Sequence, residues 1–175
     1  MNVRVSVVVM ATAVLLLAAV PVDADSYPVS FVSNAGALSD LSPLTVDVTD
    51  GARAAALAVS REESGTLVLL GLRGLDRSHA GMTYGAHVHV GPCVAGIGAA
   101  AGPHYNSTGN PAVVIDPTTE VWLDFTVRPS GTGIAVARVP FVIPSGGAGS
   151  IVIHAMPTSP TGTAGARLAC LPMAF

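Results

Sequence analysis

Glycine and proline divide most of this chain into short apolar runs. This spacing is typical of β-strands joined by turns, and it disfavours long helices. The sequence contains 19 glycines and 13 prolines, and no stretch sustains the apolar periodicity of a helix. Seven or eight short runs separated by turn residues favour an antiparallel β-sandwich or a Greek-key barrel. We therefore expect an all-β fold.

The expected strands occupy most of the chain after residue 52. They span 53–60, 65–72, 83–90, 121–128, 133–139, 150–155 and 167–171. Residues 61–65 and 129–133 have the composition of hairpin turns. Residues 25–50, rich in Ser, Asp and Pro, predict a loose leader or an edge strand, so that a single β-domain covers 51–175.

The N-terminus has the pattern of a targeting segment. Arg4 is the only charge in residues 1–22, residues 5–20 are mainly apolar, and Val22-Asp-Ala24 offers small residues for cleavage. This pattern predicts a secretory signal peptide over 1–24 and a location outside the cell or in the cell envelope. A retained anchor is the alternative, although a run of roughly 16 residues is shorter than the length of about 20 that spans a bilayer.

The two cysteines predict a disulfide. In the oxidising space that export implies, Cys93 and Cys170 favour a bridge over two free thiols. The bridge would close a loop of about 77 residues, for which the chain-entropy model gives roughly 4.5 kcal/mol. It would connect the region around Cys93 to the last expected strand.

The charge of the chain excludes some partners. The formal net charge is −3, and the sequence has no lysine and no run of basic residues. Nucleic acid and an anionic membrane surface are therefore not expected to bind, and no membrane association is expected once the signal peptide is removed. No particular oligomeric state is predicted.

Histidines gather around the first cysteine. Three of the five histidines, His87, His89 and His104, lie within a short distance of Cys93 along the chain. Side chains two apart on a strand share a face, so His87 and His89 can reach the same metal ion. His154 lies in a later apolar run, whereas His79 lies in a polar stretch and is expected to be an exposed loop residue.

Together these segments resemble the copper/zinc superoxide dismutases, in the family's order, over about residues 52–175. The matching segments are Gly71-Leu-Arg-Gly-Leu75, Gly85-Ala-His-Val-His89, Cys93, Ala101-Gly-Pro-His-Tyr-Asn106, Ile151-Val-Ile-His154 and Gly165-Ala-Arg-Leu-Ala-Cys170. The resemblance implies an eight-stranded Greek-key β-sandwich of immunoglobulin-like architecture. It also implies dismutation of superoxide to dioxygen and hydrogen peroxide by Cu(II)/Cu(I) cycling, with no organic cofactor.

The resemblance assigns roles to individual residues. It implies that one copper ion per chain is bound by His87, His89, His104 and His154. It places Arg167 beside the copper, where a guanidinium can attract and orient the small anion. His104, whose counterpart bridges copper and zinc in familiar members, is with Arg167 the implied catalytic pair.

The chain departs from the family at the zinc site. Familiar members have two further histidines and an aspartate there, but this sequence has no histidine between residues 105 and 153. The remaining donors nearby are the carboxylates of Asp116, Glu120 and Asp124, whereas structural zinc needs four donors. We therefore expect no zinc, as in the copper-only branch of the family, with a shorter loop after His154 and a more open site.

Without zinc, another group must orient the far nitrogen of His104. On an extended segment Glu120 and Asp124 share a face, so either carboxylate is a candidate to hold His104 and assist proton delivery. The alternative is that both carboxylates are solvated on the outside of a sheet.

Two other functions are compatible with these residues. One is storage or delivery of copper without turnover, and the other is that of a noncatalytic extracellular β-module with unused histidines. Arg167 favours the enzyme over the store, and the complete ligand set argues against the module. Asn106-Ser-Thr108 is formally a glycosylation acceptor.

Overall fold

The computed structural model describes residues 29–43, 45–109 and 115–175 as an all-β arrangement in which the strand pairings are antiparallel. The predicted signal peptide at 1–24 lies outside the described residues. None of the helices in the described part of the chain has the length and hydrophobicity that a bilayer span requires.

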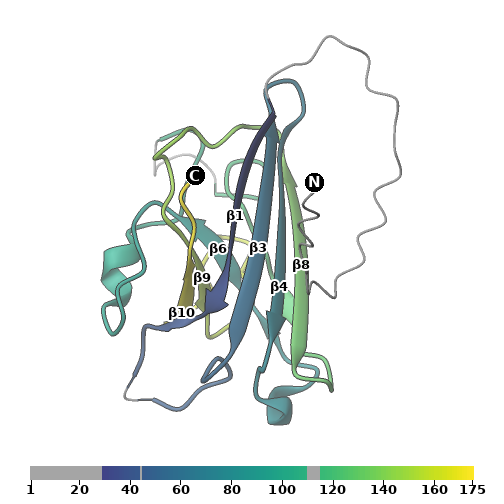
Figure 1. Cartoon of the computed structure of the whole chain (residues 1–175), viewed down its shortest axis with the longest axis vertical. Helices are drawn as coiled ribbons and strands as arrows, with labels where there is room; N and C mark the ends of the chain where they lie inside the picture. Colours follow the sequence, from purple (N-terminus) through teal and green to yellow (C-terminus); the bar gives the residue numbers. More distant parts are fainter. Residues whose placement is uncertain (1–28, 44, 110–114) are drawn as a thin grey trace, which may run out of the picture.

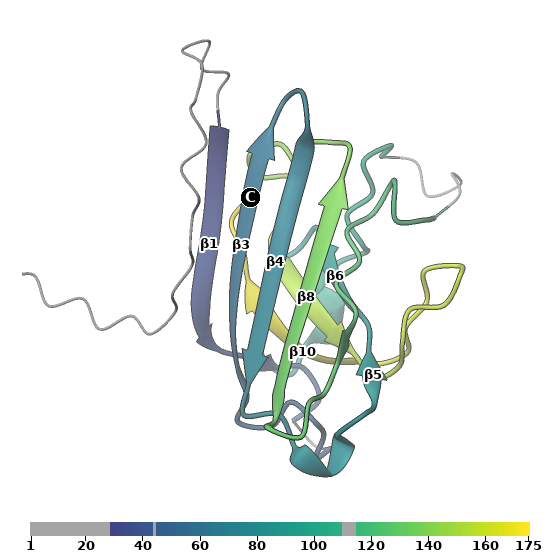
Figure 2. The ribbon, with the colours of Figure 1, turned by 90° about the vertical axis from the view of Figure 1, so that its right-hand side faces the viewer.

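The first sheet contains the longest strands. Its order is β1 (Val29–Ala37), β3 (Arg53–Arg61), β4 (Gly65–Arg73) and β8 (Thr132–Val139). Buried and more exposed residues alternate along β3 and β8, which is the pattern of a sheet with one face on the core and one toward solvent. Figures 1 and 2 show these four strands side by side.

The second sheet carries three of the five histidines and the second cysteine. Its order is β2 (Ser39–Asp40), β10 (Arg167–Pro172), β9 (Ser150–His154) and β6 (Ala86–His89). A short pair, β5 (Thr83–Tyr84) and β7 (Phe125–Thr126), and two 3₁₀ turns, η1 (Arg77–His79) and η2 (Gly98–Ala101), complete the described elements.

The core lies between the two sheets. Buried apolar side chains of the first sheet, such as Val68 and Leu70, belong to one cluster with Ile151, Ile153 and Leu171 of the second. Figure 2 shows β6 and β10 behind the first sheet. The molecule is therefore a β-sandwich, in which β6 and β9 are buried along their whole length.

Most expected strands are confirmed, and residues 29–40 resolve the choice left open for 25–50. β1 is an edge strand that pairs with β3 from Val29↔Arg61 to Ala37↔Arg53, while β2 crosses to the second sheet and pairs with β10. The turns predicted at 61–65 and 129–133 lie before β4 and β8.

Two expected strands are interrupted. The strand predicted at 83–90 divides into β5 and β6 at Gly85, where a Cβ would lie 2.8 Å from the Cβ of Ala164 and the backbone bonds instead to Met156 and His154. Of the strand predicted at 121–128, only Phe125–Thr126 is regular; Val121 and Leu123 instead bond individually to the backbone of β6.

Candidate metal centre

Four histidines from separate parts of the fold converge on one point. β6 places His87 and His89, His154 ends the neighbouring strand β9, and an isolated bridge to His89 brings in His104. Each offers one ring nitrogen, and the four nitrogens lie within 4.8 Å of one another. The predicted grouping is confirmed, and imidazole nitrogens at this spacing can hold a single metal ion.

Each imidazole has one nitrogen held by the protein. The Nδ1–H groups of His89 and His154 donate to the carbonyls of Gly102 (3.0 Å) and Gly165 (3.2 Å). Because a carbonyl only accepts, the Nε2 atom of each ring keeps its lone pair, and these two Nε2 atoms lie 3.2 Å apart. The held nitrogens therefore fix which atoms face the centre.

In His87 the protein holds the other ring nitrogen, Nε2, instead of Nδ1. Its Nε2 lies 2.7 Å from the hydroxyl of Thr158, which in turn donates to a carboxylate oxygen of Asp124. The backbone N–H of Thr158 also donates to Asp124, at 2.8 Å. Nδ1 of His87 is buried and has no hydrogen-bond partner among the described residues. A buried nitrogen without a partner is costly, and a metal ion would satisfy it.

The surroundings keep three of the rings neutral. Burial, reinforced by the neighbouring imidazoles, lowers the pKa of His87 to about 2. Burial likewise lowers the pKa of His89 to about 3 and that of His154 to about 4. Neutral imidazole is the form that binds metal, so the site is poised for metal at neutral pH.

Glu120 is the carboxylate that supports His104. Its Oε2 lies 2.8 Å from Nδ1 of His104 and accepts a second hydrogen bond from the indole N–H of Trp122 at 2.9 Å. Glu120 is 3% exposed, so the alternative that this carboxylate is solvated is wrong. Asp124, the other candidate, supports His87 through Thr158 instead of His104.

Arg167 borders the same site. It begins β10 opposite His154, and its guanidinium donates to the carbonyls of Gly98 (2.6 Å) and Gly102 (2.7 Å). The Gly102 carbonyl is also the one that accepts from His89. With His104 and His154, Arg167 lines a hollow of about 670 Å³. A fixed guanidinium beside the metal ligands can attract a small anion.

The predicted disulfide between Cys93 and Cys170 is confirmed. Cys170 lies on β10, three residues after Arg167, and the bridge connects β10 to the loop that carries Gly98 and Gly102. The carbonyls that hold Arg167 are therefore attached covalently to the strand from which Arg167 projects.

Other predicted residues lie elsewhere. Nδ1 of His79 lies 2.5 Å from the hydroxyl of Tyr84, and His79 is half-buried and not a member of the four-histidine group. Asp116 caps its own turn by accepting from Thr118. Nδ2 of Asn106, the glycosylation candidate, is buried.

Sequence reasoning missed Thr158 and Trp122. Trp122 is the single tryptophan of the chain and lies two residues from Glu120, a signal that could have been used. Thr158 lies in a loop rich in Ser, Thr and Pro and has no local signature.

Comparison with protein-family models and with curated proteins yields no match for this chain.

Proposed function

We propose that this protein is an exported copper-only superoxide dismutase of the copper/zinc superoxide dismutase family, with that family's eight-stranded Greek-key fold. The observation that carries the proposal is the convergence of four histidine nitrogens within 4.8 Å, bordered by Arg167. The disulfide is in keeping with an oxidising compartment. The order of matching segments along the chain supports the family assignment.

The donor set suits copper. Nδ1 of His87 and Nε2 of His89, His104 and His154 are the atoms that would bind the ion, because the other nitrogen of each ring is held. When bound, copper supplies the one-electron chemistry: one superoxide is oxidised to dioxygen, and a second, with the electron and two protons, is reduced to hydrogen peroxide.

Arg167 recruits the substrate. Superoxide is a small anion, and a guanidinium at the edge of the hollow attracts it and limits its orientation. Two of the five guanidinium N–H donors are used by Gly98 and Gly102, which hold the group in place before substrate arrives. No side-chain rearrangement is then needed when the anion binds.

The pair formed by His104 and Glu120 takes the place of zinc. Glu120 holds the proton on Nδ1 of His104 and so keeps the Nε2 lone pair directed at the centre. Both residues line the hollow, so we assign them proton delivery to the reduced product. Glu120 and Asp124 already serve His104 and Thr158, which supports one copper and no zinc per chain.

Metal analysis with a superoxide-consumption assay tests the proposal. We expect about one copper per chain, no zinc, and activity that appears on copper loading. Arg167→Gln is expected to lower the rate about tenfold while copper stays bound, because anion guidance contributes to encounter. Arg77→Gln, at an exposed arginine of η1, is the matched control.

Two results would contradict the enzyme assignment, and each would support one of the alternative functions. Tight copper binding without superoxide consumption would identify a copper store or carrier. Failure to bind copper at all would identify a noncatalytic β-module.

A further inference from the structure

The outer face of the first sheet has an unusual charge distribution. β1, β3, β4 and β8 contain four arginines and no acidic residue. All four point outward, since Arg53, Arg61, Arg73 and Arg138 occupy the exposed positions of their alternating strands. Arg128 joins them from the segment just before β8. Within the described chain, none of the five forms an ion pair with an acidic side chain.

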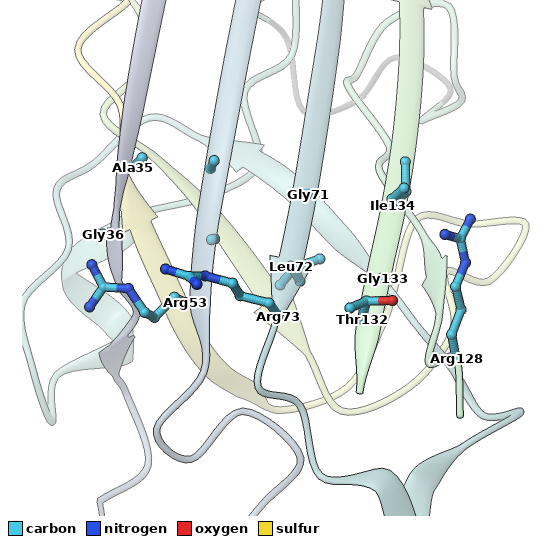
Figure 3. Close-up of a pocket in the computed structure, with 12 residues that line it drawn as sticks. Ala35, Gly36, Arg53, Gly71, Leu72, Arg73, Arg128, Thr132, Gly133 and Ile134 are labelled. Carbon is cyan, nitrogen blue, oxygen red and sulfur yellow. The ribbon is translucent and has the colours of Figure 1, made fainter. Parts of the chain in front are cut away.

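Three of these arginines surround a hollow of about 500 Å³. Figure 3 shows Arg53 and Arg73 on one side and Arg128 on the other, with Gly133 and Ile134 between them. Arg53 and Arg73 are direct cross-strand neighbours. Like charges placed directly opposite each other reduce stability, and an anion between them would remove that cost. The hollow is therefore suited to an anionic group.

An apolar stripe continues from the hollow along the same face. We define it as Phe31, Leu57, Val59, Leu69, Ile134 and Val136. Phe31 is 68% exposed, Ile134 55% and Val136 59%, so large apolar side chains project into solvent. Arg61 and Arg138 lie at the far end of the face, beside Gly65 and Leu67 in the register. Exposed apolar surface with a charged border indicates an interaction site.

We propose that this face, the apolar stripe with its five arginines, docks on an anionic lipid layer. The arginines would bind headgroups, with one headgroup in the hollow, and the stripe would contact the acyl boundary. A soluble polyanion would pair with the arginines but would leave the apolar stripe exposed to water. A second copy of the chain would bring arginines against arginines.

This surface becomes apparent only in the folded protein. The sequence has no basic run, which argued against an anionic membrane partner, but the fold collects arginines that are far apart in the chain. The residues of the hollow are distinct from those lining the metal site, so the proposed docking face does not include the hollow beside Arg167 and the histidines. The inference is independent of the proposed activity.

Vesicle flotation of the purified protein tests the inference. We expect binding to vesicles of equal parts phosphatidylglycerol and phosphatidylcholine, none to pure phosphatidylcholine, and weaker binding at high salt. Arg73→Gln should weaken binding about fivefold, and Arg53→Gln/Arg73→Gln/Arg128→Gln together about a hundredfold. Arg77→Gln, which removes one exposed arginine that does not line the hollow, should leave binding nearly unchanged.

The apolar contribution is tested separately. Ile134→Ser/Val136→Ser should weaken vesicle binding at both low and high salt, whereas circular dichroism and thermal unfolding check that each variant is folded. Absence of binding to the anionic vesicles, or an equal loss in Arg77→Gln, would overturn the proposal. Binding to dextran sulfate as tight as to vesicles, unaffected by Ile134→Ser/Val136→Ser, would instead identify a soluble polyanion as the partner.

Discussion

At the residue scale, the two ring nitrogens of His87 have very different surroundings. One is engaged by Thr158, and the other is buried without a partner among the described residues. Thr158 is itself held twice by Asp124, through its hydroxyl and its backbone N–H. This chain of contacts determines which nitrogen of His87 faces the other imidazoles, and it decides the geometry of the ligand set.

Thr158→Val should therefore alter the metal site without removing a ligand. Valine has nearly the same shape but cannot accept from Nε2 of His87, so that ring loses its fixed orientation. We expect copper affinity to fall about tenfold and the copper electron paramagnetic resonance spectrum to change. Thr126→Val, at an exposed threonine of β7, is the control; an unchanged spectrum in Thr158→Val would contradict the role.

Glu120→Gln should weaken the affinity of the site for copper. Asp124→Asn should leave the orientation of His104 unchanged, because Asp124 contacts Thr158 instead. The glutamine amide cannot carry the charge that favours a proton on Nδ1 of His104, and Oε2 of Glu120 also serves Trp122. Loss of such a partner costs about tenfold to a hundredfold in metal affinity. Titration with a copper chelator measures the effect. Glu62→Gln, at an exposed turn residue, should bind copper like the wild type.

At the scale of elements, the turn between β3 and β4 is packed closely against the end of β8. Gly65 has a φ of +74°, and a Cβ there would lie 2.0 Å from the carbonyl oxygen of Val139. Backbone lies on the other side of the contact, so no side-chain movement can relieve it. The turn thus requires glycine for two independent reasons.

Two glycine-to-alanine substitutions distinguish the cost of the left-handed backbone from the cost of the steric contact. Gly51 has a φ of +71° but nothing within 4 Å of its Cβ position. Gly51→Ala should cost about 1 kcal/mol of unfolding free energy for the left-handed backbone alone. Gly65→Ala should cost about 3 kcal/mol more, because overpacking is added. Chemical denaturation measures both; equal losses would show that β8 tolerates the contact.

At the scale of the whole molecule, the centre depends on segments that meet only after folding. β6 and β9 supply three histidines of the cluster, the segment after η2 supplies His104, and β10 supplies Arg167. Burial of His87, His89 and His154 on the face of the second sheet that points away from the inter-sheet core lowers three pKa values. The stability of the metal-free fold is therefore linked to pH.

The metal-free protein should lose stability as the pH falls below 6.5. Its unfolded form then binds protons at His87, His89 and His154, whereas the folded form does so only near its lowered pKa values of about 2, 3 and 4. Within that interval each histidine changes the free energy of unfolding by up to about 1.4 kcal/mol per pH unit. Denaturation from pH 7 to 5 measures the slope.

Removing one buried histidine should flatten that dependence. His154→Gln is expected to reduce the histidine part of the slope by about a third, since one of three such groups is lost. A steeper or unaltered slope in His154→Gln would be incompatible with a neutral buried ring.

What the sequence determined by itself is local. Glycine and proline spacing located the strands, the alternation in His87-Val88-His89 put both rings on one face, and two cysteines permitted only one intramolecular bridge. These properties depend on backbone period and residue type, which neighbours in the chain decide. The interruption at Gly85 was not visible because it depends on the approach of Ala164.

Tertiary structure alone decided which distant groups meet. Glu120 and Asp124 were equivalent on an ideal strand, but the irregular segment that carries them directs one to His104 and the other to Thr158. Four outward arginines likewise form one surface only through the register of β3, β4 and β8, and the segment before β8 adds Arg128. Such distances arise from the pairing and packing of whole elements, and no local period in the chain encodes them.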